Sequence, residues 1–181
     1  MTKEYKRRDF MVLSATAFAG IGSMFMLAPC VLSMAPSSSV RAASTVTIDL
    51  RDISPGEEKT IQWRGKPVFI KHRTTEEIEN KDSILPLKRL QDPVHSESRY
   101  KNPMWIIVLG ICTHLGCVPI IAKEGGLGYD GYSGWYCPCH GSHYDEFGRI
   151  VKGPAPRNLE VPPYYFVDDD HVLIGLDSPE S

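Results

Sequence analysis

Four of the five cysteines in this sequence lie in two short clusters that also contain histidines. The first cluster is C-T-H-L-G-C at residues 112–117, and the second is C-P-C-H-G-S-H-Y at residues 137–144. Each presents thiol and imidazole side chains on a tight turn, where Gly116 and Gly141 allow backbone that a Cβ atom would obstruct. These two turns constrain the possible folds of the chain more than any other segment, because their side chains could together form one binding site.

Three kinds of site would use these side chains. A structural zinc site can take two cysteines and two histidines, but its halves usually open with Cys-x₂₋₄-Cys or His-x₃₋₅-His, not with Cys-x-His and Cys-x-x-His. Disulfides alone would explain four cysteines in an exported domain but not the interleaved histidines. A Rieske centre needs two thiolates on one iron and two imidazoles on the other, which the two clusters supply. The residue pattern favours this third kind of site.

The two clusters closely resemble the cluster-binding boxes of the Rieske protein family. The resemblance implies one [2Fe–2S] cluster per chain and assigns the ligands position by position. Cys112 and Cys137 would bind the buried iron, and His114 and His140 would bind the outer iron. All four ligand positions match the family pattern.

The same resemblance makes Cys117 and Cys139 partners in a disulfide that joins the two loops. This bond would close a loop of 23 residues, counting both cysteines, and would contribute about 3 kcal/mol to the free energy of unfolding on a chain-entropy argument. An oxidising compartment would allow it to persist. The fifth cysteine, Cys30, lies in an apolar run, and we interpret it as a small apolar filler.

Further residues of the second box have roles that the resemblance implies. Ser142 would donate a hydrogen bond to a bridging sulfide and Tyr144 to the sulfur of Cys112, which raises the reduction potential within the Rieske range of roughly −150 to +300 mV. The histidine of this box contacts quinol in the family, so His140 is the expected acceptor of an electron and a proton. For His143 we expect a packing or surface role.

Segments outside the boxes resemble one group of the family, the quinol–cytochrome c oxidoreductases. Val118-Pro119 follows the first box, and residues 73–109 resemble the inserted segment of that group. After the second box, residues 153–156 resemble the proline loop that covers the cluster in this group; they are Gly153, Pro154, Ala155 and Pro156. The fixed φ angles of its prolines limit local motion.

The resemblance therefore implies the electron-transfer subunit of a quinol–cytochrome c oxidoreductase, an electron carrier when isolated. Its expected partners are cytochrome b, a c-type cytochrome, quinol and membrane lipid, in a dimeric complex. The formal net charge of −2 gives no basic footprint for nucleic acid. One alternative is a Rieske ferredoxin that serves an oxygenase, but such proteins usually lack both a membrane anchor and the additional cysteine pair. The other is a zinc-stabilised binding module.

A run of 25 residues without a charge, from Phe10 to Met34, predicts a single transmembrane helix. At about 1.5 Å per residue it would extend about 37 Å, enough to cross a hydrocarbon core of roughly 30 Å. Basic residues outnumber acidic ones before it, which predicts an N-terminus in the cytoplasm or matrix and a head on the other side of the membrane. No long Arg- and Ser-rich transit peptide is recognisable, which favours a bacterium with the head in its periplasm. Arg7-Arg8 resembles a twin-arginine export signal. The alternative is a signal peptide cleaved near Val40-Arg41-Ala42, but the apolar run is longer than usual for one.

The rest of the sequence predicts a mainly β head. Residues 46–50 and 60–64 alternate apolar and polar side chains, whereas residues 105–109 form a continuous apolar run typical of a buried strand. The first helical signal is the capping box of Thr74 and Glu77, and residues 80–103 are polar enough for a surface excursion. We expect an antiparallel Rieske-type β-sheet head with a small cluster-binding subdomain and one inserted helix and loop segment. The predicted divisions are a cytoplasmic N-terminus at 1–9, an anchor at 10–34, a flexible tether at 35–44, and a head at 45–181 with its cluster-binding subdomain at about 110–156.

Overall fold

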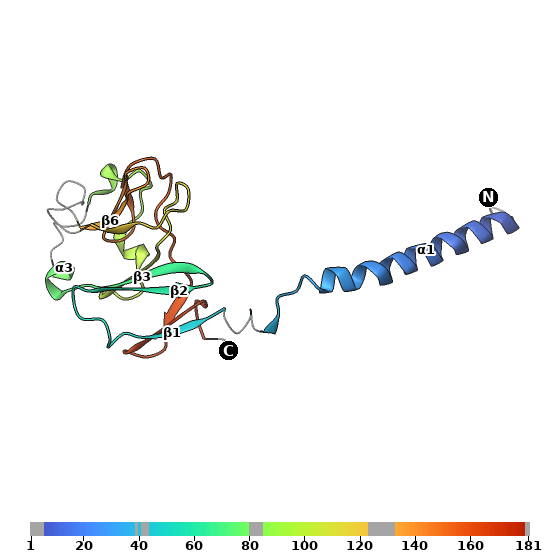
Figure 1. Cartoon of the computed structure of the whole chain (residues 1–181), viewed down its shortest axis with the longest axis horizontal. Helices are drawn as coiled ribbons and strands as arrows, with labels where there is room; N and C mark the ends of the chain where they lie inside the picture. Colours follow the sequence, from blue (N-terminus) through green and yellow to red (C-terminus); the bar gives the residue numbers. More distant parts are fainter. Residues whose placement is uncertain (1–5, 39, 41–43, 80–84, 123–132, 180–181) are drawn as a thin grey trace. The chain divides into compact units, whose positions relative to one another are not determined.

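The structure, a computed structural model, divides the chain into two compact units, Met1–Arg41 and Ala42–Ser181 (Figure 1). Each unit is described by itself. The residues that the structure describes are 6–38, 40, 44–79, 85–122 and 133–179.

The first unit contains one long helix, α1 (Arg7–Leu32). It is long and apolar enough to cross a membrane. The hydroxyls of Thr16 and Ser23 donate to the carbonyls of Val12 and Ala19, one turn earlier, at 3.0 and 2.8 Å, and these bonds satisfy polar groups that lipid could not. We interpret α1 as a single-pass membrane anchor.

The second unit is built from ten strands in three antiparallel sheets within the described residues. The base sheet has the order β1–β10–β9, the middle sheet β2–β3–β4, and the third, here called the tip sheet, β5–β6–β7–β8. This confirms the prediction of a mainly β head. The strands are β1 (Val46–Asp49), β2 (Glu58–Trp63), β3 (Lys66–His72), β4 (Trp105–Leu109), β5 (Ile120–Ala122), β6 (Gly134–Cys137), β7 (Ser142–Asp145), β8 (Ile150–Lys152), β9 (Tyr164–Phe166) and β10 (His171–Ile174).

The middle sheet lies between two hydrophobic cores, which explains the continuous apolar run in β4. Successive side chains of a strand point to opposite faces. Trp105, Ile107 and Leu109 belong to the core shared with the base sheet, while Ile106 and Val108 belong to the core shared with the tip sheet. Both faces of β4 are therefore buried, and the strand is a rigid support for the loop that follows it.

The segment between β3 and β4 contains α3 (Thr75–Glu79) and the 3₁₀ turns η2 (Leu87–Arg89) and η3 (Ser96–Arg99). The predicted capping box is confirmed, because the Thr74 amide donates to the Glu77 carboxylate at 2.9 Å and the Glu77 amide to the Thr74 hydroxyl at 3.1 Å. The expectation of a surface excursion is wrong for part of this segment. Leu85 and Leu90 are buried against Val151 in a small third core.

Two buried arginines fasten this inserted segment to the turn between β7 and β8. Arg149 pairs with Asp145 at 2.6 Å and also donates to the carbonyls of Val94 and Leu85. Arg99 donates to the carbonyls of Phe147 and Leu159. Because each guanidinium joins segments far apart in sequence, the insertion stabilises the tip sheet.

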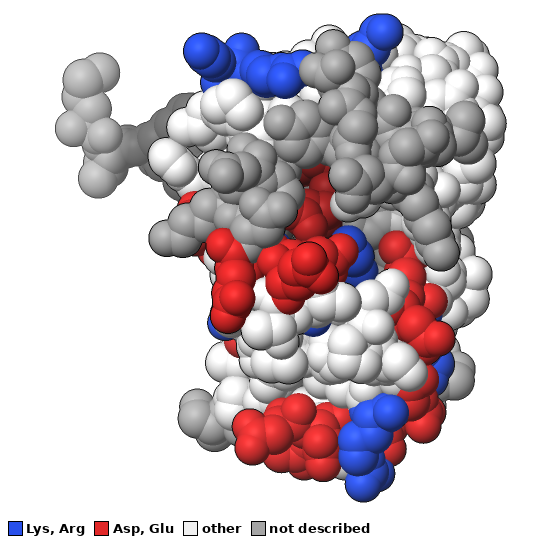
Figure 2. Space-filling view, turned by 90° about the vertical axis from the view of Figure 1, so that its left-hand side faces the viewer, with Lys and Arg blue, Asp and Glu red and all other residues white. Residues whose placement is uncertain are grey.

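The charge of the second unit is uneven. Figure 2 shows carboxylates gathered in the middle and at the lower end of one face. Basic side chains lie at the upper edge and beside the carboxylates at the lower end. Among the described residues, this face has no continuous basic surface.

Candidate metal centre

The two Cys/His clusters fold into turns of the same kind. The Gly116 amide donates to the Cys112 carbonyl at 2.9 Å, and the Gly141 amide donates to the Cys137 carbonyl at 3.0 Å. Both glycines have positive φ, +85° and +75°, a conformation that costs glycine little. Each turn thus reverses the chain within five residues.

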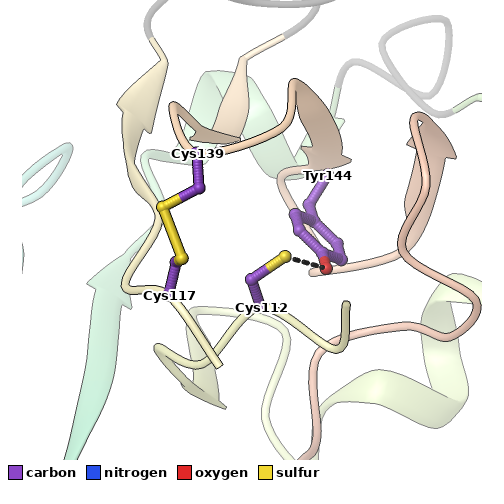
Figure 3. Close-up of a disulfide and its surroundings, with 4 residues drawn as sticks. All are labelled: Cys112, Cys117, Cys139 and Tyr144. Carbon is purple, nitrogen blue, oxygen red and sulfur yellow. Dashed lines mark hydrogen bonds between the residues drawn. A yellow bond between two sulfur atoms is a disulfide. The ribbon is translucent and has the colours of Figure 1, made fainter. Parts of the chain in front are cut away.

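Different elements position the two turns. The first follows β4 directly, and the second is the connection between β6 and β7, in which Cys137 and Ser142 are paired residues. A disulfide between Cys117 and Cys139 joins the turns (Figure 3). This is the pair that the resemblance implies, and it holds two loops from different strands together.

The two remaining cysteines of the clusters are buried thiols. Cys112 is 2% exposed and Cys137 is 1% exposed, and both belong to the core beneath the tip sheet. The sulfurs of Cys117, Cys137 and Cys139 lie within 4.8 Å of one another. Because two of these sulfurs form the disulfide, only Cys137 among the three has a thiol available to a metal.

The histidines of the two turns lie against each other. The ring centroids of His114 and His140 are 4.7 Å apart and the rings meet edge to face. His140 is exposed and His114 is half-buried. Nδ1 of His114 is buried and has no hydrogen-bond partner among the described residues, an arrangement that a metal bond would satisfy.

Tyr144 lies beside the first turn. Its hydroxyl donates to the sulfur of Cys112 at 3.3 Å (Figure 3). The Thr113 amide donates to the same hydroxyl oxygen at 3.2 Å, and the Thr113 hydroxyl lies 3.4 Å from it. Thr113 also bonds the backbone of Arg157. The sequence interpretation did not assign a role to Thr113, and no signal in its own type or spacing could have indicated one.

The loop after β8 covers the second turn. The buried hydroxyl of Ser142 accepts a hydrogen bond from the Ala155 amide at 3.2 Å. Gly153 has φ +113°, and a Cβ atom there would lie 2.5 Å from the Cα of Ser142. Ala155 is buried, while Pro154 and Pro156 are exposed. Glycine is therefore required for this loop to lie flat on the turn.

The surroundings lower the pKa of Cys112 but raise the pKa values of Cys137 and Tyr144. Burial alone would raise the pKa of Cys112, but hydrogen bonds from the Tyr144 hydroxyl and the His114 amide, among others, lower it overall. Burial raises the pKa of Cys137, and the nearby Cys112 adds to this effect. Burial and the hydrogen bond to Cys112 also raise the pKa of Tyr144. Tyr144 therefore remains a hydrogen-bond donor at neutral pH.

The predicted ligand residues thus lie on two turns that a disulfide joins. Two buried thiols, two adjacent imidazoles and an unsatisfied ring nitrogen form a donor set that fits a [2Fe–2S] cluster with mixed ligands. His143 lies apart from this set, because its ring packs on Tyr136 with centroids 4.8 Å apart.

Comparisons with known proteins agree with this donor set. The family described as Rieske [2Fe-2S] domain matches residues 44–164. A ubiquinol-cytochrome c reductase iron-sulfur subunit of Rhodospirillum rubrum is 45% identical over 95% of this chain and 93% of its own length. A mitochondrial cytochrome b-c1 complex subunit Rieske of Lagothrix lagotricha is 49% identical over 92% of this chain, which corresponds to 59% of its own length.

Among solved structures, a chain of a hyperthermophilic respiratory Complex III covers 89% of this chain with a TM-score of 0.50 at 24% identity. That likeness concerns the fold. The sequence matches show that the chain belongs to the Rieske [2Fe–2S] family, and a [2Fe–2S] cluster is its cofactor. Within the family, it belongs with the iron–sulfur subunits of quinol–cytochrome c oxidoreductases.

Proposed function

We propose that the chain takes single electrons from a quinol and passes them to a c-type cytochrome, with Cys112, Cys137, His114 and His140 as cluster ligands. The convergence of two buried thiols and two adjacent imidazoles on paired turns carries this proposal. When bound, a cluster with this ligand set exchanges one electron at a potential well above that of four-cysteine ferredoxins.

His140 is the proposed point of contact with quinol. Of the two paired histidines it is the more exposed, so a quinol hydroxyl can reach its ring. The ring nitrogen that does not bind iron accepts the quinol proton, since an imidazole has two nitrogens and a metal occupies one. Proton and electron therefore leave the quinol at the same residue.

Tyr144 and Ser142 prepare the site for electron uptake. A hydrogen bond from Tyr144 to the Cys112 sulfur stabilises the additional negative charge of the reduced state. Ser142 holds the covering loop through Ala155, and we propose that its hydroxyl also donates to a bridging sulfide. The covering loop keeps water from the buried side of the site.

The apolar helix and the relatives support a membrane-anchored subunit of an oxidoreductase complex, and we propose the remaining assignments on that basis. Residues 1–9 lie in the cytoplasm, residues 10–34 cross the inner membrane of a bacterium, and residues 35–44 connect them to a head in the periplasm that begins at residue 45. The head, with its cluster-binding subdomain at about 110–156, moves between cytochrome b and the c-type cytochrome. The complex contains two copies of each subunit, surrounded by lipid.

The substitution His140→Ala tests the ligand assignment, with His143→Ala as its matched control. His140→Ala should abolish both the Rieske electron paramagnetic resonance signal of the reduced membrane protein and quinol oxidation. His143→Ala should keep the signal, because this ring packs on Tyr136 instead of facing His114. A normal Rieske signal in His140→Ala would overturn the assignment.

A further inference from the structure

Two contacts meet at the backbone carbonyl of Ser44, the first described residue of the second unit. The indole Nε1 of Trp63 donates to this carbonyl oxygen at 2.8 Å. Trp63 ends β2, is 7% exposed and belongs to the core between the base and middle sheets. The donor is therefore fixed by packing and does not follow movements of Ser44.

Gly175 supplies the second contact. It follows β10, has φ +120°, and a Cβ atom there would lie 2.4 Å from the Ser44 oxygen and 3.1 Å from the Cα of Thr45. Its amide is bonded to the carbonyl of Pro163 at 2.7 Å, so the glycine cannot easily move away. Residues 44 and 45 lie directly on it only because it has no side chain.

These contacts precede the first strand pairing by two residues. β1 pairs with β10 from Val46, opposite Ile174. The contacts at Ser44 therefore hold the chain two residues before the strand pairing begins. In the sequence, 11 residues, 33–43, separate Ser44 from the end of α1 at Leu32.

We propose that Trp63 and Gly175 form a clasp, defined by these two residues, that fixes the head end of the tether at Ser44 and so sets the distance over which the head can move. The proposal rests on the proposed function, in which the head moves between two cytochromes. Each residue released or removed changes the reach of the tether by at most about 3.5 Å, the length of one fully extended residue. Trp63 is thus a positioning residue, far in sequence from the cluster ligands.

Hydrogen–deuterium exchange of residues 44–49 in the purified complex tests the clasp itself. Trp63→Phe removes the indole donor, and Gly175→Ala introduces a methyl group that displaces Ser44. Both should accelerate exchange in this segment, between about twofold and tenfold for the loss of one hydrogen bond. Arg64→Asn is the matched control: the Arg64 guanidinium lies 4.7 Å from the Trp63 ring centroid, and asparagine tolerates the positive φ of this position, +51°.

Unchanged exchange in both Trp63→Phe and Gly175→Ala would overturn the clasp. Equal acceleration in β4 would show general loosening of the head and would also count against it. The Rieske signal should be normal in all three variants, which confirms that the head has folded.

A deletion of Ser38 and Ser39 tests the effect on the tether. Alone, the deletion should reduce quinol–cytochrome c turnover by at least about tenfold, because misplacement of a redox partner by a few ångströms is costly. Combined with both Trp63→Phe and Gly175→Ala, it should reduce turnover less, because opening both contacts of the clasp returns Ser44 and Thr45 to the tether. Combined with Arg64→Asn, it should be as slow as the deletion alone.

The exchange and turnover measurements test the clasp and the moving head separately. If the deletion alone leaves turnover unchanged, the moving head is wrong, and with it the role of the clasp in setting length, even where exchange shows that the contacts exist. If the deletion is equally slow with and without the pair Trp63→Phe and Gly175→Ala, the clasp does not set the tether length, although the moving head stands.

Discussion

The hydroxyl of Tyr144 donates a hydrogen bond to the sulfur of Cys112 at 3.3 Å, and the Thr113 amide occupies the oxygen of that hydroxyl from the other side. The hydrogen bond between Tyr144 and Cys112 connects β7 of the tip sheet to the loop that follows β4 of the middle sheet. The surroundings of the Cys112 sulfur therefore depend on how these two sheets are positioned against each other.

The first prediction concerns the reduction potential. Tyr144→Phe removes a donor that stabilises the reduced state, so the midpoint potential should fall by roughly 60 mV, a tenfold change for a one-electron couple. Redox titration followed by electron paramagnetic resonance measures this shift. Tyr136→Phe is the control, because its ring packs on His143; equal shifts in both variants would contradict the role of Tyr144.

The second prediction concerns the covering loop. Gly153→Ala places a Cβ atom 2.5 Å from the Cα of Ser142, so the loop must move and the cluster should be lost at lower temperature. Gly65→Ala is the control: its φ is also positive, +73°, but nothing lies within 4 Å of its Cβ. The control shares the conformational cost of about 1 kcal/mol without the overlap. Visible absorbance follows the loss of the cluster on heating. If Gly153→Ala and Gly65→Ala lose the cluster at similar temperatures, the close contact between residues 153 and 142 does not stabilise the site.

The third prediction concerns the disulfide between Cys117 and Cys139. Replacing both cysteines by serine should lower the free energy of unfolding by about 3 kcal/mol, measured by guanidinium titration. The double substitution is preferable to a single one, since the Cys137 thiol lies within 4.8 Å of the other two sulfurs. An unchanged midpoint would mean that the hydrogen bonds of the turns suffice to hold the loops together.

The fourth prediction concerns pH. Glu58 accepts a hydrogen bond from the indole of Trp135 at 2.9 Å, and burial raises its pKa from 4.5 to about 7, against the opposing effects of this bond and of Lys71. The folded chain therefore keeps a proton that the unfolded chain releases, and the free energy of unfolding falls as pH rises from about 4.5 to about 7.

Glu58→Gln keeps an acceptor for Trp135 but cannot ionise. Its melting temperature should exceed that of the parent chain by about 3 °C at pH 8, with no gain at pH 4.5. Glu76→Gln, at an exposed position, should change neither value. A gain of the same size at both pH values would exclude ionisation of Glu58 as the cause.

The sequence predicts the parts of the molecule that local patterns encode. The uncharged run predicts α1, alternation predicts β1 and β2, and the two boxes predict a [2Fe–2S] centre. The short strands β5, β6 and β7 were not predicted, because turn and cluster residues dominate their sequences. The sequence also could not show that the side chains of β4 belong to two different cores. A continuous apolar run indicates that both faces of a strand are buried, but it does not indicate which sheet covers each face.

Contacts between distant residues could not be predicted either. Trp63 and Ser44 are 19 positions apart, and Trp135 and Glu58 are 77 positions apart. Each pair is set by how sheets pack, and a tryptophan has the same local signature whether its indole meets a carbonyl or a carboxylate. The residues that support the site are therefore harder to find from sequence than the residues that form it.

Chemical analysis of the natively purified membrane protein for iron and acid-labile sulfide is the most direct test of the central claim. A chain that holds one [2Fe–2S] cluster should contain two irons and two sulfides. Stoichiometric zinc, or protein with neither iron nor sulfide, would contradict it.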